Sequence, residues 1–484
     1  MKIVLILLAM LIPLIAGIVL PIVKFKNIKS KYIASAITIF ITFIIVVVNA
    51  FINREIVTIA KFSSTLSISF KIDELAALFT ILFNLIYLCV AIYSIEYMKN
   101  EKYERIFNTS FVLSLGALNA VCYSANIVTL YMSFEFVTLL SMPMVLTNMN
   151  KDAISATLKY LFYSISGALL GLLGIFFISY IANSSDFVYG GSGLDLKGLD
   201  VNFVYTMILI AIFGFGAKSG LFPLHGWLPS AHPIAPAPAS ALMSSVIAKM
   251  GVIVIIRIVY YILGPEFIFG SWMQYVWLSV AVITILMGSY MARIQEDFKK
   301  RLAYSTISQI SYAIFGVALC SSLGLEGAII QIISHALIKT VLFLYAGEVI
   351  FVNKTHSVKE LKGIGKQMPI STWCYTLASL GLIGIPFTTG FISKWYLSIA
   401  SLKGLIAVFD YLGPIIMLIS AILTAAYLLP ITIKGFFVGK DRGLYTYNEA
   451  SKLMYIPIVF LSVLIIVFGI FINPILNYIE GFVL

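Results

Sequence analysis

Residues 217–251 read AKSGLFPLHGWLPSAHPIAPAPASALMSSVIAKMG and join two long apolar runs. The stretch holds two lysines, Lys218 and Lys249, together with two histidines and five prolines. A lysine in the centre of a bilayer costs roughly 2.5–3.5 kcal/mol even on a lenient insertion scale. Proline frees a helical carbonyl, which a membrane tolerates only where protein or water satisfies it. The stretch therefore indicates a broken membrane helix that holds charge at the break.

The rest of the chain is as apolar as the flanks of this stretch. Of 484 residues, 61% are hydrophobic and 11% are charged, whereas an average soluble domain is about 25% charged. Apolar runs recur from end to end, and each is long enough to cross a hydrocarbon core of about 30 Å. A membrane barrel would instead show alternating segments of about ten residues. We therefore predict an all-α, polytopic membrane protein with about fourteen transmembrane helices. The predicted spans are 3–23, 32–52, 75–98, 106–124, 126–147, 158–182, 202–222, 237–263, 274–292, 302–320, 327–351, 370–399, 409–434 and 453–477.

Basic residues in the loops predict the orientation. Alternate loops of one set carry twenty of them: Lys24, Lys26, Lys29, Lys31, Lys99, Lys102, Arg105, Lys151, Arg293, Lys299, Lys300, Arg301, Lys354, Lys359, Lys362, Lys366, Lys434, Lys440, Arg442 and Lys452. The other set carries six: Lys2, Arg54, Lys61, Lys71, Lys197 and Lys403. Because cytoplasmic loops carry the excess, both termini are predicted outside, in an inner or plasma membrane. The net charge of +11 thus reflects orientation and not nucleic-acid binding.

A second proline break predicts internal symmetry. Pro223 interrupts the seventh span beside Lys218, and Pro386 interrupts the twelfth span before Lys394. Helices broken at matching positions of two repeated halves occur at the ion sites of transporters. We predict an N-terminal three-helix segment (1–105), two inverted five-helix repeats (106–263 and 274–434), and a final loop and span (435–484).

Ionisable residues lie inside the predicted spans, the deepest being Glu135, Lys249, Lys339 and Lys394. Unpaired, these four would cost on the order of 10–14 kcal/mol, so they must be paired, hydrated or neutral. Lysines near span ends can extend to the interface, which explains Lys159 but not Lys249. For Arg257, near the outer end of its span, both snorkelling and structural pairing stay open.

These residues predict a proton relay. Burial disfavours the charged forms of lysine and glutamate, and a nearby opposite charge favours them. A Glu–Lys pair that opens and closes is therefore a proton switch, which we predict for Glu135 and Lys218. His335 and Lys339 are four residues apart and share a helix face. The predicted row is Glu135, Lys218, Lys249, His335, Lys339 and Lys394. His225 and His232, beside the proline-rich linker, are expected outside this row in a structural or gating role.

Other features exclude alternatives. The cysteines at 89, 122, 320 and 374 lie far apart, so neither a disulfide framework nor a metal knuckle is indicated. No haem, flavin or cluster motif is visible, and we predict no cofactor and no metal in this chain. The N-terminal run MKIVLILLAMLIPLIAGIVLPIV (1–23) is too long for a signal peptide and is read as the first span.

Five stretches together resemble the antiporter-like, proton-translocating membrane subunits shared by respiratory complex I, Mrp-type sodium/proton antiporters and membrane-bound hydrogenases. They are SFEFVTLLSMPMVL (133–146), GAKSGLFPLHGWLPSAHPIAPAPASALMSSVIAKMG (216–251), EDFKKRLAYSTISQISYAIFGVAL (296–319), SHALIKTVLFLYAGEVI (334–350) and GIPFTTGFISKWYL (384–397). The resemblance implies that Glu135, Lys218 and Lys249 are the family's residues of the fifth, seventh and eighth helices. It likewise assigns His335 and Lys339 to the eleventh helix and Lys394 to the twelfth.

Details of the resemblance point to a subfamily. Lysine at 394 argues against the complex I subunit type that carries glutamate there. The chain ends soon after the fourteenth span, which argues against the distal complex I subunit with its long C-terminal extension. The linker HGWLPSAHPIAPAP (225–238) is more similar to hydrogenase-linked members.

The sequence thus predicts a subunit that moves protons, or exchanges them for sodium, within a larger membrane complex. Its partners would be other membrane subunits, lipid, and protons or sodium. A self-contained secondary transporter of a small solute is the main alternative, but it would need a substrate pocket in place of a row of titratable groups. A quinone-binding redox subunit is disfavoured by the absence of a redox motif.

Overall fold

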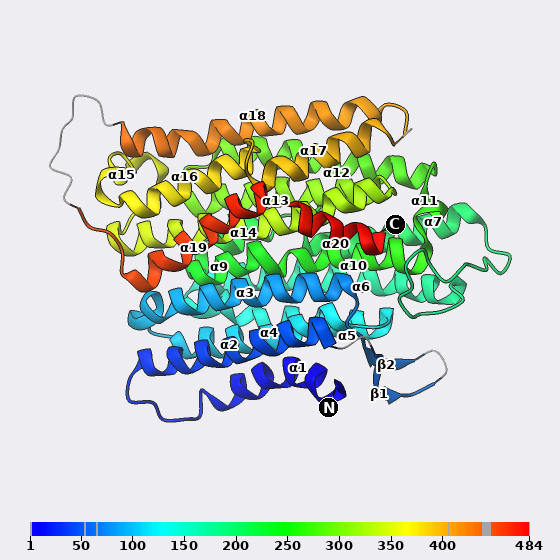
Figure 1. Ribbon diagram of the computed structural model, residues 1–484, viewed down its shortest axis with the longest axis horizontal. Helices are drawn as coiled ribbons and strands as arrows, with labels where there is room; N and C mark the ends of the chain where they lie inside the picture. Colours follow the sequence, from blue (N-terminus) through cyan, green and yellow to red (C-terminus); the bar gives the residue numbers. More distant parts are fainter. Residues whose placement is uncertain (1, 53–54, 64–65, 405, 438–446, 484) are drawn as a thin grey trace.

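The computed structural model describes residues 2–52, 55–63, 66–404, 406–437 and 447–483. Figure 1 shows a bundle of long helices that run along a common direction. Eleven helical segments in the described part of the chain are long and apolar enough to cross a membrane. The predicted all-α, multi-pass architecture is confirmed at this level.

The N-terminal segment contains three long helices and a small hairpin. Its elements are α1 (Lys2–Val19), α2 (Ile28–Ile52), β1 (Val57–Lys61), β2 (Ser67–Phe70) and α3 (Glu74–Tyr97). The two strands pair antiparallel in the polar segment between the second and third predicted spans. Arg54 of the predicted outer loops lies outside the described residues, as do Lys440 and Arg442 of the inner loops.

The middle of the chain builds the first half of the bundle. Its helices are α4 (Glu104–Tyr123), α5 (Ile127–Ser141), α6 (Lys151–Ile181), α7 (Val201–Lys218), α8 (Leu228–Ile234), α9 (Ala237–Leu242) and α10 (Lys249–Ile258). Two π-helical turns, Met243–Ile247 and Val259–Leu263, extend α9 and α10 into one long segment. Short 3-10 turns follow α3 and α5, at Met98–Asn100, Met142–Met144 and Leu146–Asn148.

The second half contains α11 (Pro265–Ile268), α12 (Trp272–Ile294), α13 (Phe298–Ala318), α14 (Ser322–Asn353), α15 (Ile364–Gln367), α16 (Pro369–Ile383), α17 (Thr389–Leu402) and α18 (Phe409–Phe436). A 3-10 turn, Val358–Glu360, precedes α15. The chain then forms α19 (Lys452–Ile470) and α20 (Asn473–Val483). The fourteenth predicted span (453–477) therefore contains nearly all of α19 and the start of α20.

Many helices begin at a short polar side chain that accepts a hydrogen bond from a backbone N–H in the first turn. Such caps satisfy N–H groups that have no partner within the helix. They are Asp73, Asn126, Asn150, Asp200, Ser271, Asp297 and Ser321.

Both predicted breaks are present. Helix α7 ends at Lys218 and α8 starts at Leu228, with Pro223 in the nonhelical segment between them. Helix α16 ends at Ile383 and α17 starts at Thr389, so the twelfth predicted span (370–399) is two helices with Pro386 between them. Carbonyls freed at the two helix ends accept hydrogen bonds from side chains, Ala217 O from Trp227 Nε1 and Leu382 O and Ile383 O from Lys394 Nζ, as membrane insertion requires.

Two segments form the centre of the bundle. In two of the eleven apolar segments, Ala237–Leu263 and Ser322–Asn353, 100% of the residues in an 18-residue apolar stretch are buried inside the protein. In Ile28–Phe51 the corresponding share is 28%. The central segments carry Lys249, His335 and Lys339. Neighbouring helices therefore separate these side chains from lipid.

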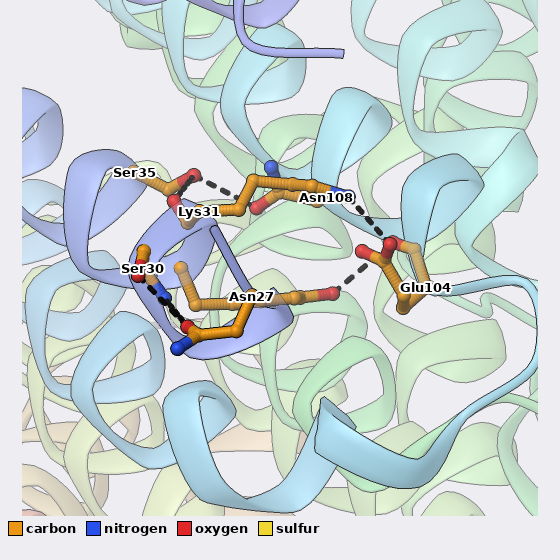
Figure 2. A network of polar contacts seen from close by, with 7 residues as sticks. Asn27, Ser30, Lys31, Ser35, Glu104 and Asn108 are labelled. Atoms are coloured by element: carbon orange, nitrogen blue, oxygen red, sulfur yellow. Dashed lines mark hydrogen bonds and ion pairs between the residues drawn. The ribbon is translucent and has the colours of Figure 1, made fainter. Parts of the chain in front are cut away.

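A polar network joins α2 to the start of α4 (Figure 2). Lys31 Nζ lies 2.5 Å from Glu104 Oε1, and Ser35 Oγ donates to Asn108 Oδ1 at 2.9 Å. Asn27 accepts from the backbone N–H of Ser30 at 2.7 Å and so caps α2. Lys31 is buried, so it is not the surface loop charge that the sequence indicated.

Candidate buried ion-relay site

Lys218 lies inside the protein at the last residue of α7, where Gly220, with a φ of 77°, turns the chain. Its Nζ donates to Thr138 Oγ1 at 2.5 Å and to Tyr160 Oη at 3.2 Å. The rings of Phe134 and Tyr160 are centred 5.3 and 5.2 Å from the same nitrogen, within range of a cation–π interaction. A helix C-terminus also favours a positive charge. Hydroxyls, aromatic faces and the helix end thus surround this lysine.

Glu135 lies on α5, three residues before Thr138, and is half-buried. Its Oε1 is buried and has no hydrogen-bond partner among the described residues. Lys218 donates to hydroxyls instead, and no ion pair joins the two side chains in the part of the chain that the structure describes. The predicted Glu135–Lys218 pair is therefore open in this structure.

Lys249 is the first residue of α10 and follows a π-helical turn. A π turn disrupts the regular hydrogen-bond ladder and is frequent at functional sites. The Nζ of Lys249 donates to the carbonyl oxygen of Ser244 within that turn. With 1% of its surface exposed, this lysine reaches no interface and is held by its own helix.

Lys339 and Lys249 bond to the same polar cluster, which contains Thr306 and Ser244. Its Nζ donates to the carbonyl oxygen of Leu302 on α13 at 3.0 Å, and Thr306 Oγ1 donates to the same oxygen at 2.9 Å. Thr306 Oγ1 in turn lies 2.7 Å from Ser244 Oγ. Lys249 donates to the backbone oxygen of the same Ser244, so the two lysines bond to one polar cluster but not to a shared atom.

His335 lies one turn before Lys339 on α14, as the spacing predicts. Its side chain is buried, and neither ring nitrogen has a hydrogen-bond partner among the described residues. Together with Lys249 it lines a small cavity in the centre of the bundle. The structure therefore brings Lys249, His335 and Lys339 together.

Lys394 occupies the second helix break. Its Nζ donates to the carbonyl oxygens of Leu382 and Ile383 at 2.6 Å each, at the C-terminal end of α16. These carbonyls have no partner within their helix, and the helix dipole favours a positive charge beside them. Gly384 has a φ of 93°, and a Cβ there would lie 2.9 Å from Lys394 Cδ. The break therefore forms the pocket that holds this lysine.

His232 lies deeper than the sequence indicates. It is fully buried, neither ring nitrogen has a partner among the described residues, and its ring stacks on Phe343 with centroids 4.8 Å apart. Lys339 Nζ lies 6.0 Å from the centroid of Phe343. The sequence placed His232 beside the proline-rich linker and outside the row, but in the structure this side chain packs inside the bundle. His225, by contrast, is only partly buried and stacks on Phe222.

Lys299 was missed as an internal residue because it lies in a basic cluster near a predicted span end. It is 3% exposed, and its Nζ donates to the carbonyl oxygen of Ala235 at 2.6 Å. Its position in the first turn of α13, two residues after the cap Asp297, is the signal that could have placed it in a helix. The hydroxyls of Thr138, Tyr160 and Thr306 were also missed, because serine, threonine and tyrosine are frequent in every span.

Arg257 is structurally paired. Its guanidinium forms a bidentate ion pair with Asp73, at 2.5 and 2.7 Å, and stacks over Tyr261 at 4.5 Å. Of the two explanations left open, pairing is the one observed. Lys159 is exposed on α6, in agreement with its expected position at an interface.

These elements define a multi-pass helical membrane protein with lysines held in its core. The sequence pattern of the family described as "NADH:quinone oxidoreductase/Mrp antiporter, TM" matches residues 124–424, and that of "NADH-Ubiquinone oxidoreductase (complex I), chain 5 N-terminus" matches residues 59–107. The first match covers more than half of the chain and the whole buried row. The chain therefore belongs to this family of antiporter-like membrane subunits, and the resemblance inferred from its motifs is confirmed.

Individual relatives come from several kinds of complex. NADH-quinone oxidoreductase subunit N of Desulforudis audaxviator is 30% identical over 430 residues, which cover 85% of this chain and 83% of that protein. Hydrogenase-4 component B of Escherichia coli is 29% identical over 371 residues, or 73% of this chain and 54% of that protein, so this chain matches about half of that relative's length. A chain in the Mrp complex from Dietzia sp. superposes with a TM-score of 0.86 at 19% identity, covering 100% of this chain and 97% of that chain. This last similarity shows the fold.

Proposed function

We propose that this chain conducts protons across the membrane along Glu135, Lys218, Lys249, His335, Lys339 and Lys394. One observation carries the proposal: the nitrogen of each of the four lysines in this row is held by hydroxyl or carbonyl oxygens and not by a carboxylate, whereas the buried Lys31 outside the row pairs with Glu104. A carboxylate partner would fix the charge of a lysine. A neutral oxygen accepts its hydrogen bond in either protonation state, so the lysine is free to gain and lose a proton.

The switch of this relay is the Glu135–Lys218 pair. In its open arrangement Lys218 donates to Thr138 and Tyr160. Closing the pair would favour the charged forms of both side chains, and opening it would favour proton release to the next group. Lys249, His335 and Lys339 form the following group, and Lys394 the last.

The chain acts as one subunit of a larger complex. Its relatives include subunits of a quinone oxidoreductase and of a hydrogenase, and a solved Mrp complex contains a chain with this fold. Partner subunits would supply redox energy or an ion gradient, and sodium would be the ion exchanged if the complex is an antiporter. The linker at 225–238 favours a hydrogenase-linked complex.

Two inverted five-helix repeats and fourteen crossings are part of this proposal. The breaks after α7 and α16 fall in corresponding members of the two predicted repeats, 106–263 and 274–434, and each lies beside a lysine, Lys218 being buried and Lys394 partly buried. The three predicted spans beyond the eleven apolar segments would be α1, α13 and the α16–α17 pair. Helix α1 is short, α13 is polar in its first half, and the twelfth span is split by its break.

A self-contained transporter of a small solute is the less favoured function. The cavity beside Lys249 and His335 leaves no room for a water molecule, so a solute has no room at this central part of the row, and the larger pockets lie away from Lys249, His335 and Lys339.

Ion transport by the assembled complex in proteoliposomes tests the proposal. Glu135→Gln, Lys218→Met and Lys394→Met should each reduce transport by roughly 100-fold or more, the contribution typical of a positioned proton-transfer group. Lys159→Met is the matched control and should retain transport, because that lysine is exposed. Equal, mild losses in all four variants would show that these charges are structural.

A further inference from the structure

A small internal cavity lies between two members of the relay and is closed by two glutamines. Lys249 and His335 line it together with Gln309 of α13 and Gln331 of α14. All four residues are at most 3% exposed. The cavity is too narrow to admit a water molecule, and its other lining residues, Ile310, Ala313 and Ile332, are apolar.

The amide of Gln331 connects three helices. Its Nε2 donates to the backbone oxygen of Gln309 at 3.0 Å and to Gln309 Oε1 at 3.3 Å. Its Oε1 accepts from Ser393 Oγ of α17 at 2.6 Å. Ser393 precedes Lys394 in the chain. This one side chain therefore extends from the central cavity to the helix that carries the last lysine of the relay.

An amide cannot itself relay the proton, because it offers donors and an acceptor but no group that titrates. Polar atoms around the cavity are nevertheless left without partners. Gln309 Nε2 and both ring nitrogens of His335 are buried and unbonded among the described residues. Buried polar groups of this kind are ordinarily satisfied by water, given enough room. These three nitrogens are therefore the groups that water would satisfy if the cavity were wider, while the amide of Gln331 bridges its walls.

We propose that Gln331 is the gate between the central group, Lys249, His335 and Lys339, and Lys394. The inference rests on the proton-conducting function proposed above and assigns its regulation to one residue. While the amide bridges Gln309 and Ser393, the two parts of the relay are separated. When the amide moves away, the cavity widens, and water bonded to His335 and Gln309 completes the path towards Lys394. Gln331 is a positioning residue, since no proton passes through it.

The amide of Gln331 has two proposed effects: it supplies a polar wall to the cavity, and it bridges Gln309 and Ser393. Two substitutions separate these effects when the assembled complex is measured in proteoliposomes. Gln331→Leu keeps the volume but removes the polar wall, so energised transport should fall roughly 10- to 100-fold, as for a mispositioned transfer group, with no added leak. Gln331→Asn keeps the amide but is one methylene too short to bridge both partners. It should raise the passive proton leak under an imposed pH gradient. Gln274→Leu is the control, because Gln274 is an equally buried glutamine whose Nε2 donates to Ala318 O, away from the relay.

Wild-type transport in Gln331→Leu together with a wild-type leak in Gln331→Asn would overturn the gate. If the leucine variant fails to assemble, the leak of the asparagine variant decides, and a wild-type leak overturns the gate. The proposed function fails separately, if Lys394→Met retains transport. Loss of transport in Lys394→Met with unchanged Gln331 variants would keep the relay and remove the gate.

Discussion

At the scale of single residues, Lys218 and Lys339 are stabilised by neutral oxygens that come from other helices. Lys218 is bonded by side chains of α5 and α6, and Lys339 by a carbonyl of α13. The sequence predicted the lysines because a charge inside an apolar run is conspicuous. It could not predict Thr138 or Tyr160, because which hydroxyl meets which lysine depends on how separate helices pack.

The acceptors of Lys218 should matter as much as the lysine itself. Thr138→Val combined with Tyr160→Phe removes both hydroxyls at nearly constant volume. A buried donor left without a partner costs about 1–3 kcal/mol, so transport should fall roughly 5- to 100-fold in proteoliposomes while assembly persists. Thr157→Val is the control, because Thr157 is buried on α6 but donates only to the carbonyl of Ala153 in its own helix. Equal losses in the double variant and the control would show a general packing effect.

The two linker histidines should differ. His232 is fully buried against Phe343, close to Lys339, whereas His225 is only partly buried. His232→Gln should therefore reduce proton transport by roughly tenfold or more, as expected for a group that positions a proton path, and His225→Gln should change it little. Transport and assembly are measured together for both variants. The opposite ranking would place the relay on the other side of the linker.

Asp73 makes stability depend on pH at the acidic end. Burial raises the pKa of Asp73, but the charge and hydrogen bonds of Arg257 and the N–H of Ala76 outweigh it, so the pKa lies below its usual range. The stabilisation is thus present above the unfolded pKa of about 3.9 and is lost as the pH falls through the lower folded value. Asp73→Asn should cost about 3–5 kcal/mol at neutral pH and flatten the acid dependence of thermal unfolding.

A solvent-exposed ion pair is the control for that prediction. Lys359 and Glu296 lie 2.5 Å apart, but their side chains are 66% and 62% exposed. Glu296→Gln should therefore change stability by only about 0–1 kcal/mol. A loss as large as that of Asp73→Asn would show that burial of the Arg257 pair is not what makes it strong.

At the scale of elements, the sequence predicted the helix breaks but not their detailed form. Proline at 223 and 386 located both breaks within a few residues. The π-helical turn before Lys249 was not predictable, because a one-residue widening leaves no pattern in hydrophobicity. The long eighth predicted span (237–263) contains two such turns, so in the structure it is a composite of α and π segments.

The break between α16 and α17 needs glycine at 384 for two reasons, its positive φ and its close approach to Lys394. A pair of substitutions separates the two reasons. Gly384→Ala meets both a φ of 93° and contact with Lys394, so it should lose about 1–2 kcal/mol and also impair transport. Gly190→Ala is the control, because Gly190 has a φ of 86° but a Cβ added there would have no atom within 4 Å. It should lose similar stability in thermal unfolding but retain transport. Retained transport in Gly384→Ala would show that the exact fit around Lys394 is unimportant.

At the scale of the whole molecule, composition was sufficient for the membrane class and motifs for the family. The arrangement of the helices around two central segments was not predictable, since hydropathy alone does not distinguish a lipid-facing helix from a buried one. The segments Ser322–Asn353 and Ile28–Phe51 are both apolar, yet the share of buried residues in their apolar stretches is 100% and 28%. Polar residues such as Gln331 and His335 distinguish Ser322–Asn353, the buried segment, from the lipid-facing one.

Orientation is the remaining prediction at this scale, and it follows from the loop charges. Twenty basic residues in one set of loops and six in the other predict a cytoplasmic face for the 293–301 loop and an outer face for both termini. Figure 1 shows both chain ends directed towards the end of the bundle that carries the β1–β2 hairpin, as an even number of crossings requires. The four native cysteines are buried, so a thiol reagent would react with a cysteine introduced at an exposed position and not with the native ones. Glu296→Cys should resist a membrane-impermeant thiol reagent added to intact cells, and Val188→Cys, 51% exposed in the loop between α6 and α7, should react. Labelling at 296 from outside with protection at 188 would invert the molecule in the membrane, and with it the direction in which the relay runs.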